Sequence, residues 1–221
     1  MGAGLRVISQ DGSNAFQIDD NYQNLFLRHK GTIATTLVSN PTYNTTYTVA
    51  VTVSGCRGVP MIASRCGVPC HSYAGPTGTP GEYLISFIVM GPLGTVIDYY
   101  VFDVLGTDEG SNFGIKVWNA AGQLQFDAGK KPMRVVDYFA DQETGPRTYP
   151  SGRTYAVALA GGGGSNSLSG GGGAGYVILT SGAVVAGNVV QATFFQILGG
   201  SGGGTNMRQT FFALVLDVTN Y

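Results

Sequence analysis

The second half of the chain repeats the first half in outline, and this repeat limits the possible folds more than any other feature. Three pairs of segments match in the same order: residues 4–16 with 114–126, 47–51 with 155–159, and 101–104 with 215–218, at offsets of 110, 108 and 114 residues. Collinear matches whose offsets drift by a few residues are typical of a tandem duplication with insertions and deletions in its loops. The repeat therefore predicts two similar domains.

The matches also set the predicted domain limits. Copy one covers residues 1–105, a polar linker covers 106–113, and copy two covers 114–221. A copy of roughly 100 residues has the size of one compact β-domain.

Local patterns predict strands in both copies. Apolar residues alternate with polar ones around Arg6 and Lys116, which is the two-residue period of a half-buried strand, and Gly12 and Gly122 follow as turn residues. Each copy is therefore expected to begin with a hairpin. The other strand candidates are TYTVAVTV, YLISFIVM and IDYYVFDV in copy one, and TYAVALA, YVILT, QATFFQIL and FFALVLDV in copy two. The predicted fold is all-β, with two tandem β-sandwich-like domains and long Gly/Pro-rich loops.

Charge and hydropathy exclude several classes of protein. With 12 Lys and Arg against 13 Asp and Glu, the chain lacks the basic surface that a nucleic-acid partner requires. Residues 154–207 contain no charged side chain, but polar residues and glycines interrupt the run too often for a membrane-spanning helix. The N-terminal residues contain no apolar stretch typical of a secretory signal.

Two long insertions separate corresponding strand candidates. Residues 55–82 are rich in proline and cysteine, whereas residues 161–175 are mostly glycine. Such insertions are either contact loops or, for the glycine-rich one, flexible spacers, and both interpretations stay open here. We expect the stiffer loop 55–82 to make the specific contact and copy two to act as the anchor.

Four residues are weak candidates for a metal site: Cys56, Cys66, Cys70 and His71. Three thiols and an imidazole can bind zinc, but adjacent Cys70 and His71 fit no standard zinc spacing. A disulfide and inert buried thiols are the alternatives. No metal and no cofactor are expected.

No catalytic arrangement is found in the sequence. The chain has two histidines and no G-x-S-x-G motif after a strand, and no Gly-Lys-Ser/Thr follows its glycine-rich segment. The chain is therefore expected not to be an enzyme.

Both predicted hairpins resemble the opening of minor tail proteins of long-tailed bacteriophages (siphoviruses). In copy one the resemblance lies in Gly4-Leu5-Arg6-Val7, Asp11-Gly12, Ile18-Asp19-Asp20, Asn24-Leu25 and Lys30-Gly31-Thr32. In copy two it lies in GIKVWNAAGQLQFDAGKKPMRVV, and the final VLDVTNY is similar to the close of such domains.

The resemblance implies a structural component of the virion at the tail tip or baseplate, assembled in the host cytoplasm. Implied partners are other tail proteins (hub, central fibre or baseplate), further copies of the same chain with three-fold symmetry favoured, and a possible host surface receptor. The alternative is a carbohydrate-binding or adhesin-type surface module. Its aromatic platform would come from Tyr43, Tyr47, Tyr99, Tyr100 and Tyr149.

Overall fold

The computed structural model describes residues 4–8, 15–19, 24–40, 46–106, 111–112, 114–140, 144–160, 166–167, 175–201 and 212–221. These residues form strands, turns and irregular segments without any helix. The strands of residues 1–105 are β1 (Gly4–Ile8), β2 (Ala15–Asp19), β3 (Phe26–Ala34), β4 (Leu37–Asn40), β5 (Thr46–Val53), β6 (Met61–Arg65), β7 (Cys70–Pro76), β8 (Tyr83–Val89) and β9 (Val96–Asp103). The strands of residues 114–221 are β10 (Lys116–Trp118), β11 (Leu124–Asp127), β12 (Val135–Phe139), β13 (Pro146–Thr148), β14 (Tyr155–Ala160), β15 (Asn166–Ser167), β16 (Gly175–Ala186), β17 (Val189–Ser201) and β18 (Phe212–Asp217).

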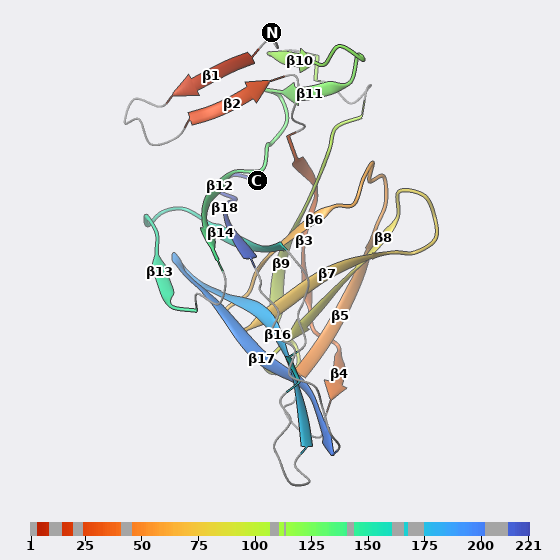
Figure 1. The fold of residues 1–221 in the computed structure, drawn as a ribbon, viewed down its shortest axis with the longest axis vertical. Helices are drawn as coiled ribbons and strands as arrows, with labels where there is room; N and C mark the ends of the chain where they lie inside the picture. The colour runs from red at the N-terminus through yellow and green to blue at the C-terminus, as the bar shows by residue number, and fades with distance from the viewer. Residues whose placement is uncertain are drawn as a thin grey trace.

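Two large antiparallel sheets form the body of the molecule (Figure 1). The six-stranded sheet has the order β12-β18-β14-β6-β9-β3, and the eight-stranded sheet has the order β13-β17-β16-β7-β8-β5-β4 with β15 paired to β16. Apolar side chains of both sheets meet between them, for example Ile62 and Val101 from one sheet with Phe87 from the other. The predicted all-β, sandwich-like fold is confirmed.

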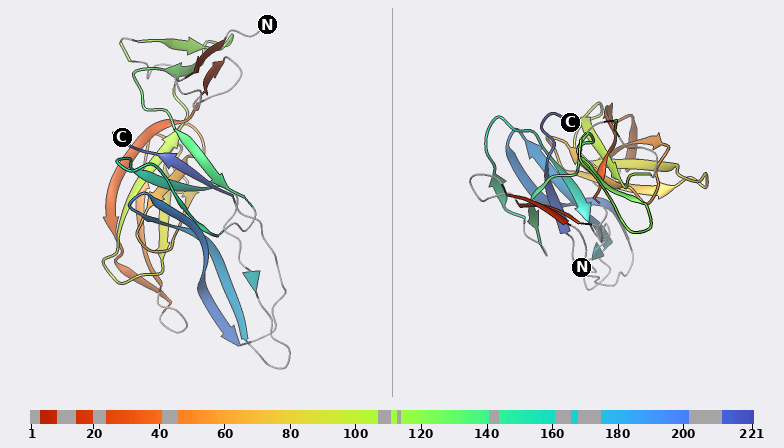
Figure 2. Two further views of the ribbon diagram at one scale, coloured as in Figure 1. Left: turned by 90° about the vertical axis from the view of Figure 1, so that its left-hand side faces the viewer. Right: turned by 90° about the horizontal axis from the view of Figure 1, so that it is seen from above.

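The two predicted hairpins are present and form a separate layer at one end of the sandwich (Figures 1 and 2). β1 pairs with β2 so that Val7 lies opposite Phe16, and β10 pairs with β11 so that Val117 lies opposite Phe126. The two registers match at the offset of 110 residues that the repeat predicts. Contact between the Phe26 and Phe126 rings, 6.0 Å apart, links the second hairpin to the start of β3.

Both large sheets contain strands from both predicted domains. β6 pairs with β14 in one sheet, and β7 pairs with β16 in the other. We call these two strand pairs the junction. Residues 1–105 and 114–221 therefore share two continuous sheets and do not build two separate sandwiches, because joining these strands satisfies backbone groups that would otherwise lie at open sheet edges. The duplication itself stays a prediction.

The outer matches of the repeat agree with the topology, but the middle match does not. β9 and β18 hold corresponding places, each beside the edge strand β3 or β12. Residues 47–51 lie in β5 of the eight-stranded sheet, whereas residues 155–159 lie in β14 of the six-stranded sheet. The predicted correspondence of these two segments is therefore wrong.

The proline-rich insertion 55–82 is not one long loop. It contains β6 and β7, the strands through which copy one reaches the junction. Pro60 and Pro69 stand directly before these strands and Pro76 ends β7, which are the positions at a strand's ends where proline costs no ladder hydrogen bond. The glycine-rich insertion 161–175 lies outside the described residues except for β15 and Gly175.

The charge-free run 154–207 supplies β14, β15, β16 and β17 to the two sheets. In the described part of the chain, no helix is long and apolar enough to cross a membrane.

Candidate functional site

The three cysteines are buried free thiols, and all three belong to the core cluster between the two sheets. The thiol of Cys70 donates a hydrogen bond to the carbonyl oxygen of His71 at 3.8 Å, and its side chain also interacts with that of Cys66. The interaction with Cys70 is the main reason why the pKa of Cys66 is lowered to about 7, while the same interaction and burial raise the pKa of Cys70. Cys56 lies near Asp103 and Arg28, and burial raises the pKa of its thiol.

His71 does not join the cysteines. It follows Cys70 on β7, so its side chain points to the opposite face of the strand. Its Nδ1 lies 2.8 Å from the carbonyl oxygen of Ser181, to which it donates, and its ring lies 5.8 Å from that of Tyr73. Among the described residues no three His, Cys, Asp or Glu side chains are placed to hold a metal ion.

The candidate tyrosines do not form one platform. Tyr43 lies outside the described residues. Tyr99 packs into the core, with its ring 5.8 Å from that of Phe87, whereas Tyr100 points to the opposite face of β9. Tyr47 packs against the same core as Tyr99.

Tyr149 belongs to another part of the molecule. Its ring lies 5.1 Å from that of Tyr155, and its hydroxyl donates to Asp137 Oδ2 at 2.8 Å. The sugar-binding platform predicted from these tyrosines is therefore not assembled by the residues that the structure describes.

A different surface has the character of a contact site. We call the side of the six-stranded sheet that faces away from the eight-stranded sheet the outer face. Its buried and half-buried residues are Met61, Ala63, Tyr100, Phe102, Ala156, Ala158, Leu214 and Leu216. Their chain neighbours Ile62, Val101, Val157 and Val215 belong to the clusters between the sheets, as the alternation of side chains along a strand requires. The sheet is therefore apolar on both faces.

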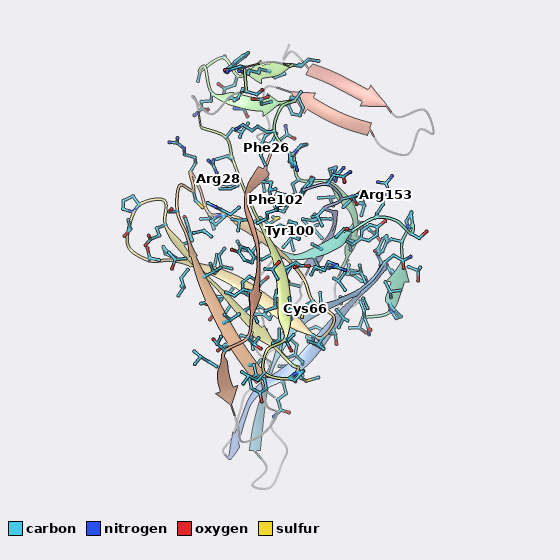
Figure 3. The ribbon with its side chains drawn as sticks, turned by 180° about the vertical axis from the view of Figure 1, so that it is seen from behind. Phe26, Arg28, Cys66, Tyr100, Phe102 and Arg153 are labelled. Atoms are coloured by element: carbon cyan, nitrogen blue, oxygen red, sulfur yellow. The ribbon has the colours of Figure 1, made fainter. Side chains whose placement is uncertain are left out.

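The chain itself covers part of the outer face. The Tyr221 ring lies 6.0 Å from that of Phe102, and the guanidinium of Arg134 lies 4.7 Å from the Tyr221 ring. Leu25 and Met133 pack into the same cluster. Figure 3 shows Phe102 and Tyr100 following one another along β9 below Phe26.

The part of this side of the sheet nearest β12 is exposed. Tyr138 and Val135 lie directly opposite Leu214 and Leu216, and so project on the same side of the sheet. Tyr138 is 59%, Phe212 47% and Val135 45% exposed. We call Val135, Tyr138 and Phe212 the exposed apolar strip.

The backbone groups of Tyr138, at the β12 edge next to this strip, already have hydrogen-bond partners. The Tyr138 amide donates to Asp137 Oδ1, and the Tyr138 carbonyl accepts from Arg147, both at 2.8 Å. Burial tends to raise the pKa of Asp137, but hydrogen bonds from Tyr149, Arg147 and the Tyr138 amide outweigh it and lower this pKa. These backbone groups of Tyr138 are therefore not open to pairing with an added strand.

Two buried carboxylates hold loops at corresponding ends of β9 and β18. Asp217 accepts hydrogen bonds from the Thr219 amide at 2.9 Å and from Arg153 at 2.5 Å. Asp103 accepts from the backbone amides of Arg57 and Gly58. These bonds anchor the chain segments that leave the sheet.

Sequence reasoning missed the exposed apolar strip, although a signal for it is present. The strands YAVALA (β14) and FALVLD (β18) are almost continuously apolar, and such runs are typical of strands covered on both faces. No protein-family model, curated protein or solved structure matches the chain. The site therefore has to be judged from its own geometry.

Proposed function

We propose that this chain is a non-enzymatic structural component of a bacteriophage tail tip or baseplate, and that the exposed apolar strip contacts another tail protein or a further copy of the chain. The observation that carries the proposal is the strip itself. A solvated face of an antiparallel sheet normally alternates to polar residues, and contiguous exposed apolar surface usually marks a protein contact. Here Tyr138 and Phe212 continue an apolar face and are about half exposed.

The proposal that the protein belongs to a phage tail rests on the resemblance of both hairpins to minor tail proteins. The hairpin layer projects from the sandwich, which leaves it accessible to neighbours in an assembly (Figure 2). Several copies under closed symmetry, with three-fold favoured, would bury the strip of every copy in an equivalent contact. Any contribution to host attachment would then come from surfaces other than the strip.

The test replaces two side chains of the strip without disturbing the core. The variant carries Tyr138→Ser and Phe212→Ser. The matched control carries Leu37→Ser and Val59→Ser, which remove two apolar side chains that are 65% and 79% exposed elsewhere. Analytical ultracentrifugation measures self-association, and particle assembly in a phage whose tail gene encodes the variant measures incorporation.

We expect the strip variant to keep the melting temperature of the wild type and to lose association or incorporation at least tenfold. The control variant is expected to behave as wild type in both measurements. Wild-type association and incorporation of the strip variant would refute the proposed contact. Failure to find this chain in any tail particle, with association intact, would refute the tail setting alone.

A further inference from the structure

Cys66 and Cys70 form a thiol pair between β6 and β7. Three residues separate them in the chain, and their side chains are 3% and 1% exposed. Both belong to the core cluster between the two sheets, and their side chains interact closely enough to shift the pKa of each thiol.

The pair lies at the junction of the two halves of the chain. The carbonyl of Cys66 accepts a hydrogen bond from the Val185 amide at 2.7 Å, and Cys70 pairs with Ala183 of β16. A covalent link between the two cysteines would therefore fix the turn that carries copy one from the six-stranded sheet to the eight-stranded sheet.

We propose that Cys66 and Cys70 are a redox modification site that closes to an intramolecular disulfide, while Cys56 stays a thiol. Cys66 and Cys70 meet the same short stretch of β16, at Val185 and Ala183, and this shared position supports the pairing. Cys56 belongs to the same core cluster, but the charges of Asp103 and Arg28 act on its thiol and neither of the other two cysteines does. A peroxide is the class of oxidant that suits the site, because hydrogen peroxide is small and uncharged and both sulfurs are buried.

The reaction has two steps. The Cys66 thiolate attacks one oxygen of hydrogen peroxide, the O–O bond breaks, hydroxide leaves and Cys66 becomes a sulfenic acid. The Cys70 sulfur then attacks the Cys66 sulfur, the S–O bond breaks and the S–S bond forms. Two thiols lose two electrons and two protons, and the peroxide takes them up to give two molecules of water.

The surroundings of the two thiols decide which one attacks the peroxide and which one then attacks the sulfenic acid. The interaction with the Cys70 side chain favours the thiolate of Cys66, whose pKa of about 7 makes it the attacking group near neutral pH. Cys70, whose pKa is raised, is the resolving thiol.

The test oxidises the reduced, purified full chain with hydrogen peroxide, quenches with acid and alkylates the remaining thiols after denaturation. Mass spectrometry then counts alkyl groups and locates them. We expect one alkylated residue, Cys56, and a bridge between Cys66 and Cys70. The Cys56→Ser variant should form the same bridge, whereas Cys66→Ser and Cys70→Ser should form none.

Two further measurements test the role assignment and the effect of the bridge. The initial oxidation rate should rise about tenfold between pH 6 and pH 8, because the thiolate fraction of a group with pKa near 7 rises by that factor. Peroxide treatment should raise the melting temperature of the wild type by about 5 °C, because the bridge forms. The same treatment should leave the melting temperature of Cys70→Ser unchanged, because this variant cannot form the bridge. Three alkylated cysteines after oxidation, or a bridge that includes Cys56, would overturn the proposal.

Discussion

Ala63 and Ala158 lie directly opposite each other where β6 pairs with β14, and neither side chain is exposed to solvent. The other neighbours of the two alanines are Tyr100 and Leu214, which correspond in the repeat at the offset of 114 residues. The two halves of the chain therefore meet at a pair of alanines, which have the smallest apolar side chain. The side chains of Tyr100 and Leu214 flank the two alanines and belong to the same apolar cluster on the outer face.

A charge at this position should destabilise the protein. Ala158→Glu places a carboxylate where no solvent reaches it, so we expect a loss of about 3 kcal/mol in the free energy of unfolding, measured by urea denaturation. Thr52→Glu is the control, since Thr52 is an exposed residue of β5 in the eight-stranded sheet, and it should change stability by less than about 0.5 kcal/mol. Equal stability of both variants would contradict the burial of Ala158.

Gly182 in β16 packs directly against the aromatic ring of Phe195, which leaves no room for a larger side chain. A Cβ atom at this position would lie 2.6 Å from Cε1 of Phe195 and 2.9 Å from the carbonyl oxygen of Cys70. We expect Gly182→Ala to cost about 2 kcal/mol, because the buried ring and the backbone must both shift. Gly75→Ala in the neighbouring strand β7 meets no atom within 4 Å and should be almost neutral. A calorimetric melting temperature equal to that of wild type for Gly182→Ala would contradict the packing.

Protonation of His71 should make stability depend on pH in the weakly acidic range. Burial lowers the pKa of this ring, and its hydrogen bond to the Ser181 carbonyl opposes the effect only in part. The unfolded chain then binds a proton at about pH 6.5 while the folded chain does not, so stability is full above this pH and falls as the pH decreases below it. Denaturation at pH 7.5, 6 and 5 should show this loss in wild type and in His29→Gln. His71→Gln should lack it, and an unchanged pH profile in that variant would assign the loss to another group.

Asp217 should contribute to acid denaturation at lower pH. Burial tends to raise the pKa of this carboxyl, but hydrogen bonds from Thr219 and Arg153 and the charge of Arg134 together lower it. A lowered pKa means that its contribution is present above the unfolded value of about 4 and is lost as the pH falls through the folded value.

The corresponding variant is Asp217→Asn, which should lose about 2 kcal/mol at pH 7 and show a weaker decline below pH 4. Asp98→Asn is the control, because the Asp98–Arg65 pair is partly exposed and such pairs contribute little. A smaller loss in Asp217→Asn than in Asp98→Asn would contradict the anchoring role of Asp217.

The two hairpins were predictable because their pairing is local. Alternation around Arg6 and Lys116, followed by glycines at 12 and 122, is sufficient to bring Val7 opposite Phe16 and Val117 opposite Phe126. Gly122 adopts a φ of 76°, the left-handed conformation that favours glycine in such a turn.

The candidate site was predictable only in part. Spacing in the chain indicated Cys66, Cys70 and His71 as one group, but Cys70 and His71 are successive residues of β7 and point to opposite faces, which separates the ring from the Cys70 thiol. The exposed apolar strip combines β12 with β18, which lie more than 70 residues apart in the chain, so the apolar run of β18 indicates a strand covered on both faces but not that β12 lies beside it.

The sequence by itself determined the two hairpins, the strands with a clear pattern and the all-β class, because the period of two and the positions of glycine and proline act within a few residues. It did not show β6 and β7, which lie in the segment expected to be a loop. Only the tertiary structure decided that β6 joins β14, that β7 joins β16, and that one face of the six-stranded sheet keeps an apolar strip in contact with solvent. The physical reason is that backbone hydrogen bonds between strands are nearly the same for any pair of partners. The choice of partner therefore depends on the summed burial of distant side chains, which the period of a single strand does not record.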